Sequence, residues 1–182
     1  VIVTYKEGNV SKTATTRITV VAVTPTKIEF NDAPTKKFYV GDESSAFDPD
    51  GLTAVVTYNN GTTKEFDVND LDITYSGFDT TTARTITMTG TYQGVSGKFD
   101  VVINAVELVS VAVNTKPNKT KYYVGEEFDQ TGLTLTATYN NGKTEVVSTG
   151  ITCTGFSSAA AGAKTITATY GGKSTTFRAD IE

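Results

Sequence analysis

Two stretches of this chain repeat each other, and this repeat constrains the fold more than any other feature. Residues 55–64 read VVTYNNGTTK and residues 136–145 read TATYNNGKTE. The similarity extends on both sides of the shared Tyr-Asn-Asn-Gly motif, so that the two copies span roughly 26–104 and 107–182. A chain with such a repeat is expected to fold as similar units that follow one another.

Apolar residues in each copy alternate with threonine, which is the pattern of a strand with one buried face. The chain is rich in Thr, and no stretch has the apolar spacing of a long helix. The pattern therefore predicts antiparallel sheets and little or no helix. The alternating rows are Leu52, Ala54, Val56 and Tyr58 in the first copy, and Leu133, Leu135, Ala137 and Tyr139 in the second.

The repeated motif is expected to form the corner of a hairpin in each copy. Its Asn-Gly pair suits the positive φ values of a type I′ two-residue turn, and the tyrosine before it closes the apolar row. The residues to which we assign a structural role are Tyr58, Asn60, Gly61, Phe78, Tyr139, Asn141, Gly142 and Phe156.

Each copy holds about seven short strands separated by frequent turn signals, as in an immunoglobulin-like sandwich. The chain is thus predicted to be all-β, with two tandem immunoglobulin-like β-sandwiches at residues 24–105 and 106–182. In matching the copies, we pair Thr85-Ile86-Thr87 with Thr165-Ile166-Thr167.

The first 23 residues resemble residues 88–106, with a Thr-Tyr strand end, a turn and a second alternating strand. Residues 1–23 are therefore expected to be the last two strands of a truncated upstream copy. We expect this hairpin to lean on the next unit or on another chain, because two strands alone are marginally stable. The alternative is that it completes a sheet of a sandwich as a swapped element.

The segment between the copies, residues 104–110, reads NAVELVS and contains neither Gly nor Pro. The last strand of one copy is expected to run almost directly into the first strand of the next, giving a semi-rigid connection. Val106 and Leu108 are expected to be buried at this joint.

The second copy combines YVGE.FD..GL...ATYNNG with a later TGF and KTIT..Y.G....F. This combination is similar to the bacterial immunoglobulin-like domains, in particular the group-three type. The first copy departs from it by inserting Ser44, Ser45 and Ala46 and by placing Asp42 where the second has Glu126. These changes affect a loop and leave the expected fold unchanged.

The resemblance implies a bacterial protein that is extracellular, either secreted or attached to the cell surface, with modules in tandem. It brings no catalytic residues with it. It implies a spacer or stalk whose partners are neighbouring domains of the same polypeptide. The alternative is direct adhesion or carbohydrate binding beside a surface enzyme, with a glycan or a host protein as the partner.

Charge and composition argue against several other functions. The net charge is −4 and the basic residues are scattered, which argues against nucleic acid and anionic membranes as partners. No run approaches the ~18 apolar residues that span a bilayer, so no membrane insertion is expected. Without His, and with Cys153 as the single cysteine, the chain lacks a familiar catalytic triad. We expect no enzyme activity and no cofactor.

Acidic residues in DVNDLD, at 67–72, are the candidates considered for a calcium site: Asp67, Asp70 and Asp72. An EF-hand loop that begins at Asp67 would need Gly at its sixth position, where Asp72 stands. The second copy has no acidic counterpart, and aspartates are common in turns. We therefore expect these residues to be turn formers and expect no metal.

Overall fold

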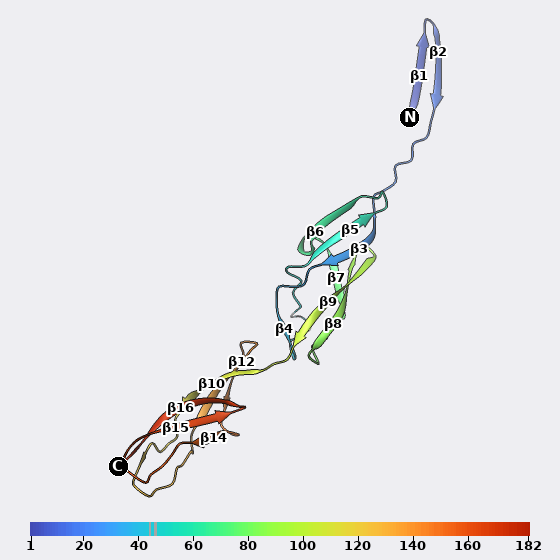
Figure 1. The fold of residues 1–182 in the computed structure, drawn as a ribbon. Coiled ribbons are helices and arrows are strands. Elements are labelled where there is room, and N and C mark those ends of the chain that lie inside the picture. Colours follow the sequence, from blue (N-terminus) through green and yellow to red (C-terminus); the bar gives the residue numbers. More distant parts are fainter. Residues whose placement is uncertain (44, 46) are drawn as a thin grey trace. The chain divides into compact units, whose positions relative to one another are not determined.

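The computed structural model describes residues 1–43, 45 and 47–182, so the inserted Ser44 and Ala46 lie outside the described residues. The described residues consist mainly of strands and turns, with a short 3-10 helix at Val68–Asp70. Figure 1 shows these strands as an N-terminal hairpin and two β-sandwiches. The predicted all-β fold with tandem immunoglobulin-like sandwiches is confirmed, while the boundaries at residues 24–105 and 106–182 stay a prediction.

The first sandwich contains two sheets. One has the order β3-β5-β6, with β3 at Pro25–Asn31, β5 at Thr53–Tyr58 and β6 at Thr63–Asp67. The other has the order β4-β9-β8-β7, with parallel pairing between β4 and β9. Its strands are β4 (Phe38–Tyr39), β7 (Ile73–Ser76), β8 (Arg84–Tyr92) and β9 (Val95–Asn104).

The second sandwich repeats this topology. Its three-stranded sheet has the order β10-β12-β13, and its four-stranded sheet has the order β11-β16-β15-β14, again with a parallel first pair. The repeat in sequence is therefore a repeat in strand order. The strands are β10 (Leu108–Thr115), β11 (Lys121–Tyr122), β12 (Thr134–Tyr139), β13 (Thr144–Val147), β14 (Thr152–Thr154), β15 (Gly162–Tyr170) and β16 (Lys173–Ile181).

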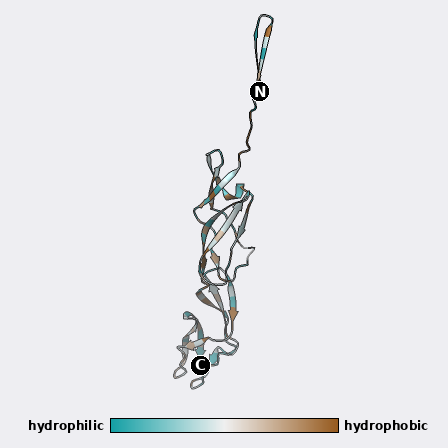
Figure 2. Ribbon diagram, turned by 90° about the vertical axis from the view of Figure 1, so that its right-hand side faces the viewer, coloured by the Kyte–Doolittle hydropathy of each residue, from teal (hydrophilic) through white to brown (hydrophobic). Residues whose placement is uncertain are grey.

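Each sandwich buries its own alternating rows between its sheets. Figure 2 colours the ribbon by the hydropathy of each residue. Side chains at every second position of a strand point to the same face, so one face of each sheet supplies the core. The first core contains Ile28, Phe38, Leu52, Ala54, Val56, Val68, Ile86, Met88, Phe99, Val101 and Ile103. The second contains Val111, Tyr122, Leu133, Leu135, Ala137, Val147, Ile166, Ala168, Phe177, Ala179 and Ile181.

The strand register corrects the match between β8 and β15. Ser76 lies opposite Thr89, and Thr154 lies opposite Thr167, so Thr89 and Thr167 occupy equivalent positions. Met88 therefore corresponds to Ile166, and the match through the repeated Thr-Ile-Thr is wrong by two residues. A shift of two keeps every side chain on the same face, so the alternation of apolar residues alone could not reveal it.

The N-terminal hairpin is a separate two-stranded sheet, made of β1 (Ile2–Glu7) and β2 (Val10–Thr15). It pairs with no strand of either sandwich of its own chain, and the swapped-element alternative, which involves a second chain, stays a prediction. Residues 1–24 are all exposed, and the packing of this hairpin on the next unit or on another chain stays a prediction.

The two apolar residues of the connecting segment differ in their surroundings. Leu108 is half-buried and packs against the core of the second sandwich. Val106 is 39% exposed, so its expected burial is wrong. Alternation does not explain the difference, because the two residues are two positions apart and would share one face of a strand. Val106 lies before β10, which begins at Leu108.

Candidate functional site

The repeated corner is a three-residue hairpin loop in both sandwiches, and the predicted type I′ turn is wrong. The Gly61 N–H donates to the carbonyl oxygen of Tyr58, and the Tyr58 N–H donates to that of Thr62, both at 2.9 Å. Only the glycine has a positive φ, at 80°, and Asn60 does not. This arrangement is a type I turn followed by a left-handed glycine. The same two bonds recur around Gly142, whose φ is 78°.

The second asparagine of the motif stabilises this loop from within. Asn60 Oδ1 accepts hydrogen bonds from the N–H and the hydroxyl of Thr62, at 3.1 and 2.7 Å. Asn141 Oδ1 accepts from the Lys143 N–H at 3.1 Å. Short polar side chains commonly bond to the backbone two residues further on, which explains why Asn suits this place.

The first asparagine binds the chain that enters the sandwich, and sequence reasoning missed this role. The Asn59 N–H donates to the Thr24 carbonyl oxygen at 3.0 Å, and the Thr24 N–H donates to Asn59 Oδ1 at 3.3 Å. Asn59 Nδ2 also donates to the Ala22 carbonyl oxygen at 2.9 Å. The side-chain amide thus offers one donor and one acceptor, as a strand edge does.

Asn140 makes the same three bonds in the second sandwich. Its N–H donates to the Glu107 carbonyl oxygen at 2.9 Å, and the Glu107 N–H donates to Asn140 Oδ1 at 3.0 Å. Asn140 Nδ2 donates to the Ala105 carbonyl oxygen at 3.0 Å. The sequence contained a signal for this role. The turn itself uses only the second asparagine, yet both copies of the motif carry two.

A carboxylate closes the turn after the short strand in each copy. Glu126 Oε2 accepts from Lys119 Nζ at 2.9 Å and from the Tyr123 N–H at 2.8 Å. The hydrogen bond from Lys119, and then the one from the Tyr123 backbone, lowers the pKa of the Glu126 carboxyl. Asp42 Oδ2 accepts from the Tyr39 N–H at 2.8 Å, so the shorter acid keeps the backbone bond.

The aspartates that follow Phe47 and Phe128 bond to the backbone of the next loop. Asp48 Oδ1 accepts from the Asp50 N–H at 3.1 Å, and Asp129 Oδ1 accepts from the Thr131 N–H at 2.9 Å. The bonds from Thr131, side chain first and backbone second, lower the pKa of the Asp129 carboxyl. These acids bond to loop backbone, which is an ordinary structural task for aspartate.

Both phenylalanines that follow a glycine belong to aromatic clusters. The Phe78 ring centroid lies 5.4 Å from that of Phe47. The Phe156 centroid lies 4.8 Å from that of Tyr122 and 5.3 Å from that of Phe128. Ring pairs at these distances stabilise a core beyond the area they bury.

The acids considered for calcium do not form a cluster. Asp67 Oδ1 accepts from the Asn69 N–H at 2.9 Å and caps the short helix Val68–Asp70. Across residues 1–43, 45 and 47–182, no group of three potential ligand side chains, Asp70 and Asp72 included, is placed to hold a metal ion. None of the helices in the described residues has the length and apolar character to cross a membrane.

Cys153 is half-buried, and burial raises the pKa of its thiol. It occupies the position of Tyr75 in the first sandwich, since each lies two residues before a glycine. The pKa of Tyr75 is also raised, by burial first and by the charge of Asp67 second. Neither group has the lowered pKa of an activated nucleophile.

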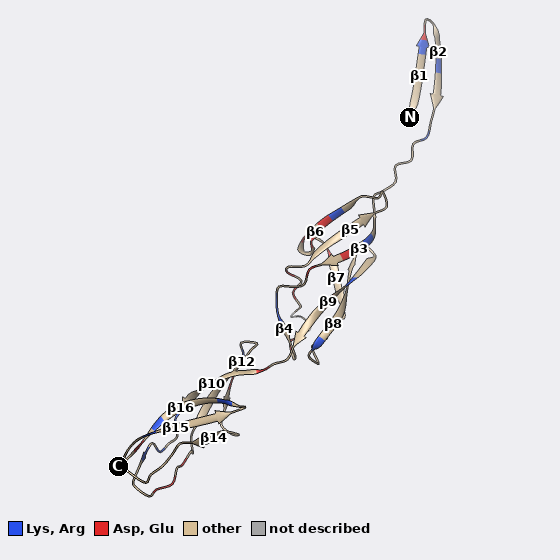
Figure 3. Ribbon diagram, viewed as in Figure 1, with Lys and Arg blue, Asp and Glu red and all other residues tan. Residues whose placement is uncertain are grey.

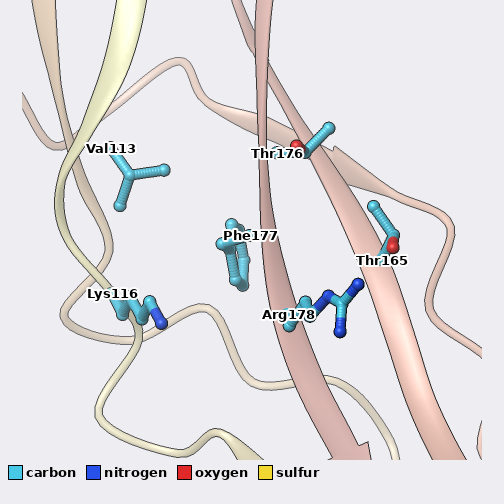
Figure 4. Close-up of a pocket in the computed structure, with 6 residues that line it drawn as sticks. All are labelled: Val113, Lys116, Thr165, Thr176, Phe177 and Arg178. Carbon is cyan, nitrogen blue, oxygen red and sulfur yellow. The ribbon is translucent and has the colours of Figure 1, made fainter.

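One cleft of about 460 Å³ lies at the edge of the second sandwich, where β10 passes β16. Figure 4 shows Val113 and Lys116 on one side, the Phe177 ring between the strands, and three further side chains on the other side. Elsewhere the lysines and arginines are scattered along the chain (Figure 3). The lining residues are Val113, Lys116, Thr165, Thr176, Phe177 and Arg178.

Two curated proteins are similar to this chain in sequence. Pectate lyase L of Thermoclostridium stercorarium is 29% identical over 180 residues, which cover 93% of this chain and 14% of the lyase. Exo-beta-1,6-galactobiohydrolase of Bifidobacterium longum subsp. longum is 34% identical over 103 residues, which cover 53% of this chain and 7% of that enzyme. The chain thus spans a small part of either protein.

Two solved structures of the surface layer protein SbsC also align with this chain. Its domains 4–9 align over 99% of this chain and 34% of that one, with 13% identity and a TM-score of 0.33. Its domains 4 and 5 align over 86% of this chain and 98% of that one, with 14% identity and a TM-score of 0.33.

Both repeated units match a known family of domains. The bacterial Ig-like domain (group 3) matches residues 32–102 and 115–180, one region within each sandwich. These regions make up well over half of the sequence, and the chain therefore belongs to the bacterial Ig-like domain family of group 3.

Proposed function

We propose that this chain is a non-catalytic spacer or stalk segment of a larger bacterial protein that is secreted or displayed at the cell surface. The observation that carries the proposal is the alignment of 93% of this chain with only 14% of pectate lyase L. A whole pair of modules is thus matched inside an enzyme many times longer. Its partners would be the neighbouring domains of its own polypeptide.

The hydrogen bonds at the two corners support this role. Asn59 and Asn140 each bind the backbone that enters their sandwich, through one side-chain acceptor and one side-chain donor. A spacer must transmit position along its length, and a chain fixed where it enters a module has less freedom there.

The placement of polar side chains supports a non-catalytic segment. The carboxylates of Asp48, Glu126 and Asp129 accept hydrogen bonds from nearby loop backbone. Glycoside hydrolysis would instead need a pair of carboxylates that face each other across a substrate. The relatives' catalytic activities therefore reside, on this proposal, in parts of those proteins that this chain does not match.

Small-angle X-ray scattering of the full chain tests the proposal. A compact globule of 182 residues would have a radius of gyration of about 16 Å. A spacer holds its ends apart, so we expect a clearly larger radius that does not change with protein concentration. A radius near the compact value would show that the modules fold back on each other and would contradict a spacer.

A further inference from the structure

We propose that the cleft between β10 and β16 binds an acidic polysaccharide, with Lys116 and Arg178 contacting its anionic groups. This proposal goes beyond the spacer role and does not depend on it, because a module can carry a ligand whether or not it holds other domains apart. Four observations support it: the shape of the cleft, its charge, the different residues at the corresponding edge of the first sandwich and the intact core beneath it.

The cleft has an apolar wall next to polar groups. Val113 on β10 is half-buried, and the Phe177 ring on β16 points toward β10 and is 6% exposed (Figure 4). The volume of about 460 Å³ is in the range of small-ligand sites. Sugar rings have one apolar face and several hydroxyls. Val113 can contact the apolar face at the opening of the cleft, and Thr165 and Thr176, on the exposed face of β15 and β16, carry hydroxyls beside it.

Two cations flank this wall. Lys116 lies on the β10 side of the Phe177 ring, and Arg178 lies on the other side (Figure 4). Both are exposed, and neither belongs to an ion pair or hydrogen bond found among the described residues. A guanidinium binds carboxylate or phosphate oxygens through two parallel N–H groups, which a neutral sugar cannot match.

The corresponding edge of the first sandwich is filled differently. Val113 pairs across the strands with Leu135 as Phe30 pairs with Ala54, so Phe30 holds the position of Val113. The Phe30 ring lies 5.0 Å from Phe99 and packs over Gly97, where an added Cβ would come within 3.0 Å of the ring. A phenylalanine thus closes the edge that a valine leaves open.

The charges differ at the same place. Asp100 occupies the position of Arg178, and its Oδ1 accepts a hydrogen bond from the Thr87 hydroxyl at 2.7 Å. Thr35 and Asn118 are equivalent, because the Thr35 N–H donates to the Asp50 carbonyl oxygen as the Asn118 N–H donates to that of Thr131. Ala33, two residues before Thr35, therefore occupies the position of Lys116. Only the second sandwich therefore has cations at these two positions, and it is also the copy with valine in place of Phe30.

The cleft is not a packing defect, because the core beneath it is full. The large and small partners are exchanged between copies, with Phe30 against Ala54 in one and Val113 against Leu135 in the other. Leu135 is fully buried, and so is Ala168, which stands where the first copy has Gly90. The volume lost at Val113 is thus replaced in the interior, and the opening remains only at the edge.

The binding test uses the full chain and three probes: a short oligogalacturonate, its methyl ester and a sugar phosphate. Calorimetry gives affinities, and amide shifts in two-dimensional NMR locate the site. We expect binding of a charged probe, shifts centred on Val113 and Phe177, and weaker binding as salt is raised. The methyl ester keeps the ring and loses the charge, so it should not bind.

Three exposed substitutions assign the site. Arg178→Asp installs the residue of the first sandwich, and Lys116→Ala does likewise. Each should weaken binding by about tenfold or more, because each removes a charged hydrogen-bond partner. Lys143→Ala, at the corner loop, removes the same charge elsewhere and should leave the affinity unchanged.

Each outcome decides the proposal. Binding of oligogalacturonate, of the sugar phosphate or of both supports it and identifies carboxylate or phosphate as the recognised group. Absence of binding to both charged probes overturns it. It is also overturned by equal binding of the methyl ester, by shifts centred on the first sandwich, or by full affinity in Arg178→Asp and Lys116→Ala. None of these outcomes bears on the radius of gyration that tests the spacer role.

Discussion

Asn140 and the backbone of Glu107 exchange two hydrogen bonds: the Glu107 N–H donates to Asn140 Oδ1 at 3.0 Å, and the Asn140 backbone N–H donates to the Glu107 carbonyl oxygen at 2.9 Å. Asn140→Ala removes the side-chain acceptor and the donor to Ala105. We expect a loss of about 1 kcal/mol in the free energy of unfolding, since each exposed hydrogen bond contributes modestly. Hydrogen exchange at the Glu107 amide should become faster, which NMR can follow residue by residue.

Asn141→Ala is the matched control for this substitution. Asn141 bonds within the corner loop, to the Lys143 N–H at 3.1 Å, and not to the entering chain. Exchange at Glu107 should stay slow in this variant. Equal acceleration of Glu107 exchange in both variants would mean that the loop as a whole, and not the Asn140 amide, holds the entering segment.

Gly90 and Phe30 should be energetically coupled. An added Cβ at Gly90 would overlap the Phe30 ring, so we expect Gly90→Ala to destabilise the first sandwich by about 1–3 kcal/mol. The second sandwich carries alanine and valine at these two positions, as Ala168 and Val113. Phe30→Val should therefore relieve part of the cost of Gly90→Ala.

A double-mutant cycle by chemical denaturation measures this coupling. The double variant should be more stable than the sum of the two single effects predicts, because the clash disappears when the ring is removed. Strict additivity would show that the backbone relaxes around the new methyl group and that the two positions are independent.

Acid should weaken the second sandwich through Glu126. Its pKa is lower in the folded chain, because of the bonds from Lys119 and from the Tyr123 backbone. A lowered folded-state pKa contributes stability above the unfolded pKa, and this contribution is lost as the pH falls through the folded value. The loss should begin below about pH 5 and continue as the carboxyl protonates.

Glu126→Gln keeps the shape of the side chain and cannot ionise. The variant should be less stable than the parent chain near neutral pH, and the difference should shrink in acid. Denaturation curves recorded between neutral pH and about pH 3 measure this dependence. A difference that stays constant with pH would show that the charge of Glu126 contributes nothing and that only its hydrogen bonds matter.

Cys153 should react slowly with alkylating reagents in the folded chain. Burial raises the pKa of its thiol, so a smaller fraction is thiolate at neutral pH than in an exposed cysteine. Iodoacetamide labelling followed by mass spectrometry should therefore be several-fold faster after denaturation. Equal rates in the folded and denatured chain would contradict the half-buried position.

The strand pattern could be predicted from the sequence because alternation of apolar residues reports directly on a buried face. Leu52, Ala54 and Val56 are all fully buried, as the alternating row indicated. Alternation reports parity and not register, which is why the match between β8 and β15 was wrong by two residues. The Asn-Gly pair predicted the position of the corner but not its turn type, because two-residue and three-residue loops both favour glycine with a positive φ and differ in which flanking residues pair.

The candidate site was less accessible to sequence reasoning than the fold. Arg178 and Lys116 are far apart in the sequence, and each looks like an ordinary exposed cation. They flank one cleft because β10 passes the edge of β16, which no local pattern encodes. A comparison of the two copies position by position could have shown that Phe30 and Asp100 are replaced together, but this comparison requires the correct register.

The exchanged partners in the two cores have a consequence for folding. Tandem domains of similar sequence can misassemble by trading strands. If β3 paired with β12, Phe30 would meet Leu135 and the core would be overfilled. If β10 paired with β5, Val113 would meet Ala54 and leave a void. Either error would cost about 1–3 kcal/mol or more, so the divergence between the copies helps each strand find its own neighbour during synthesis.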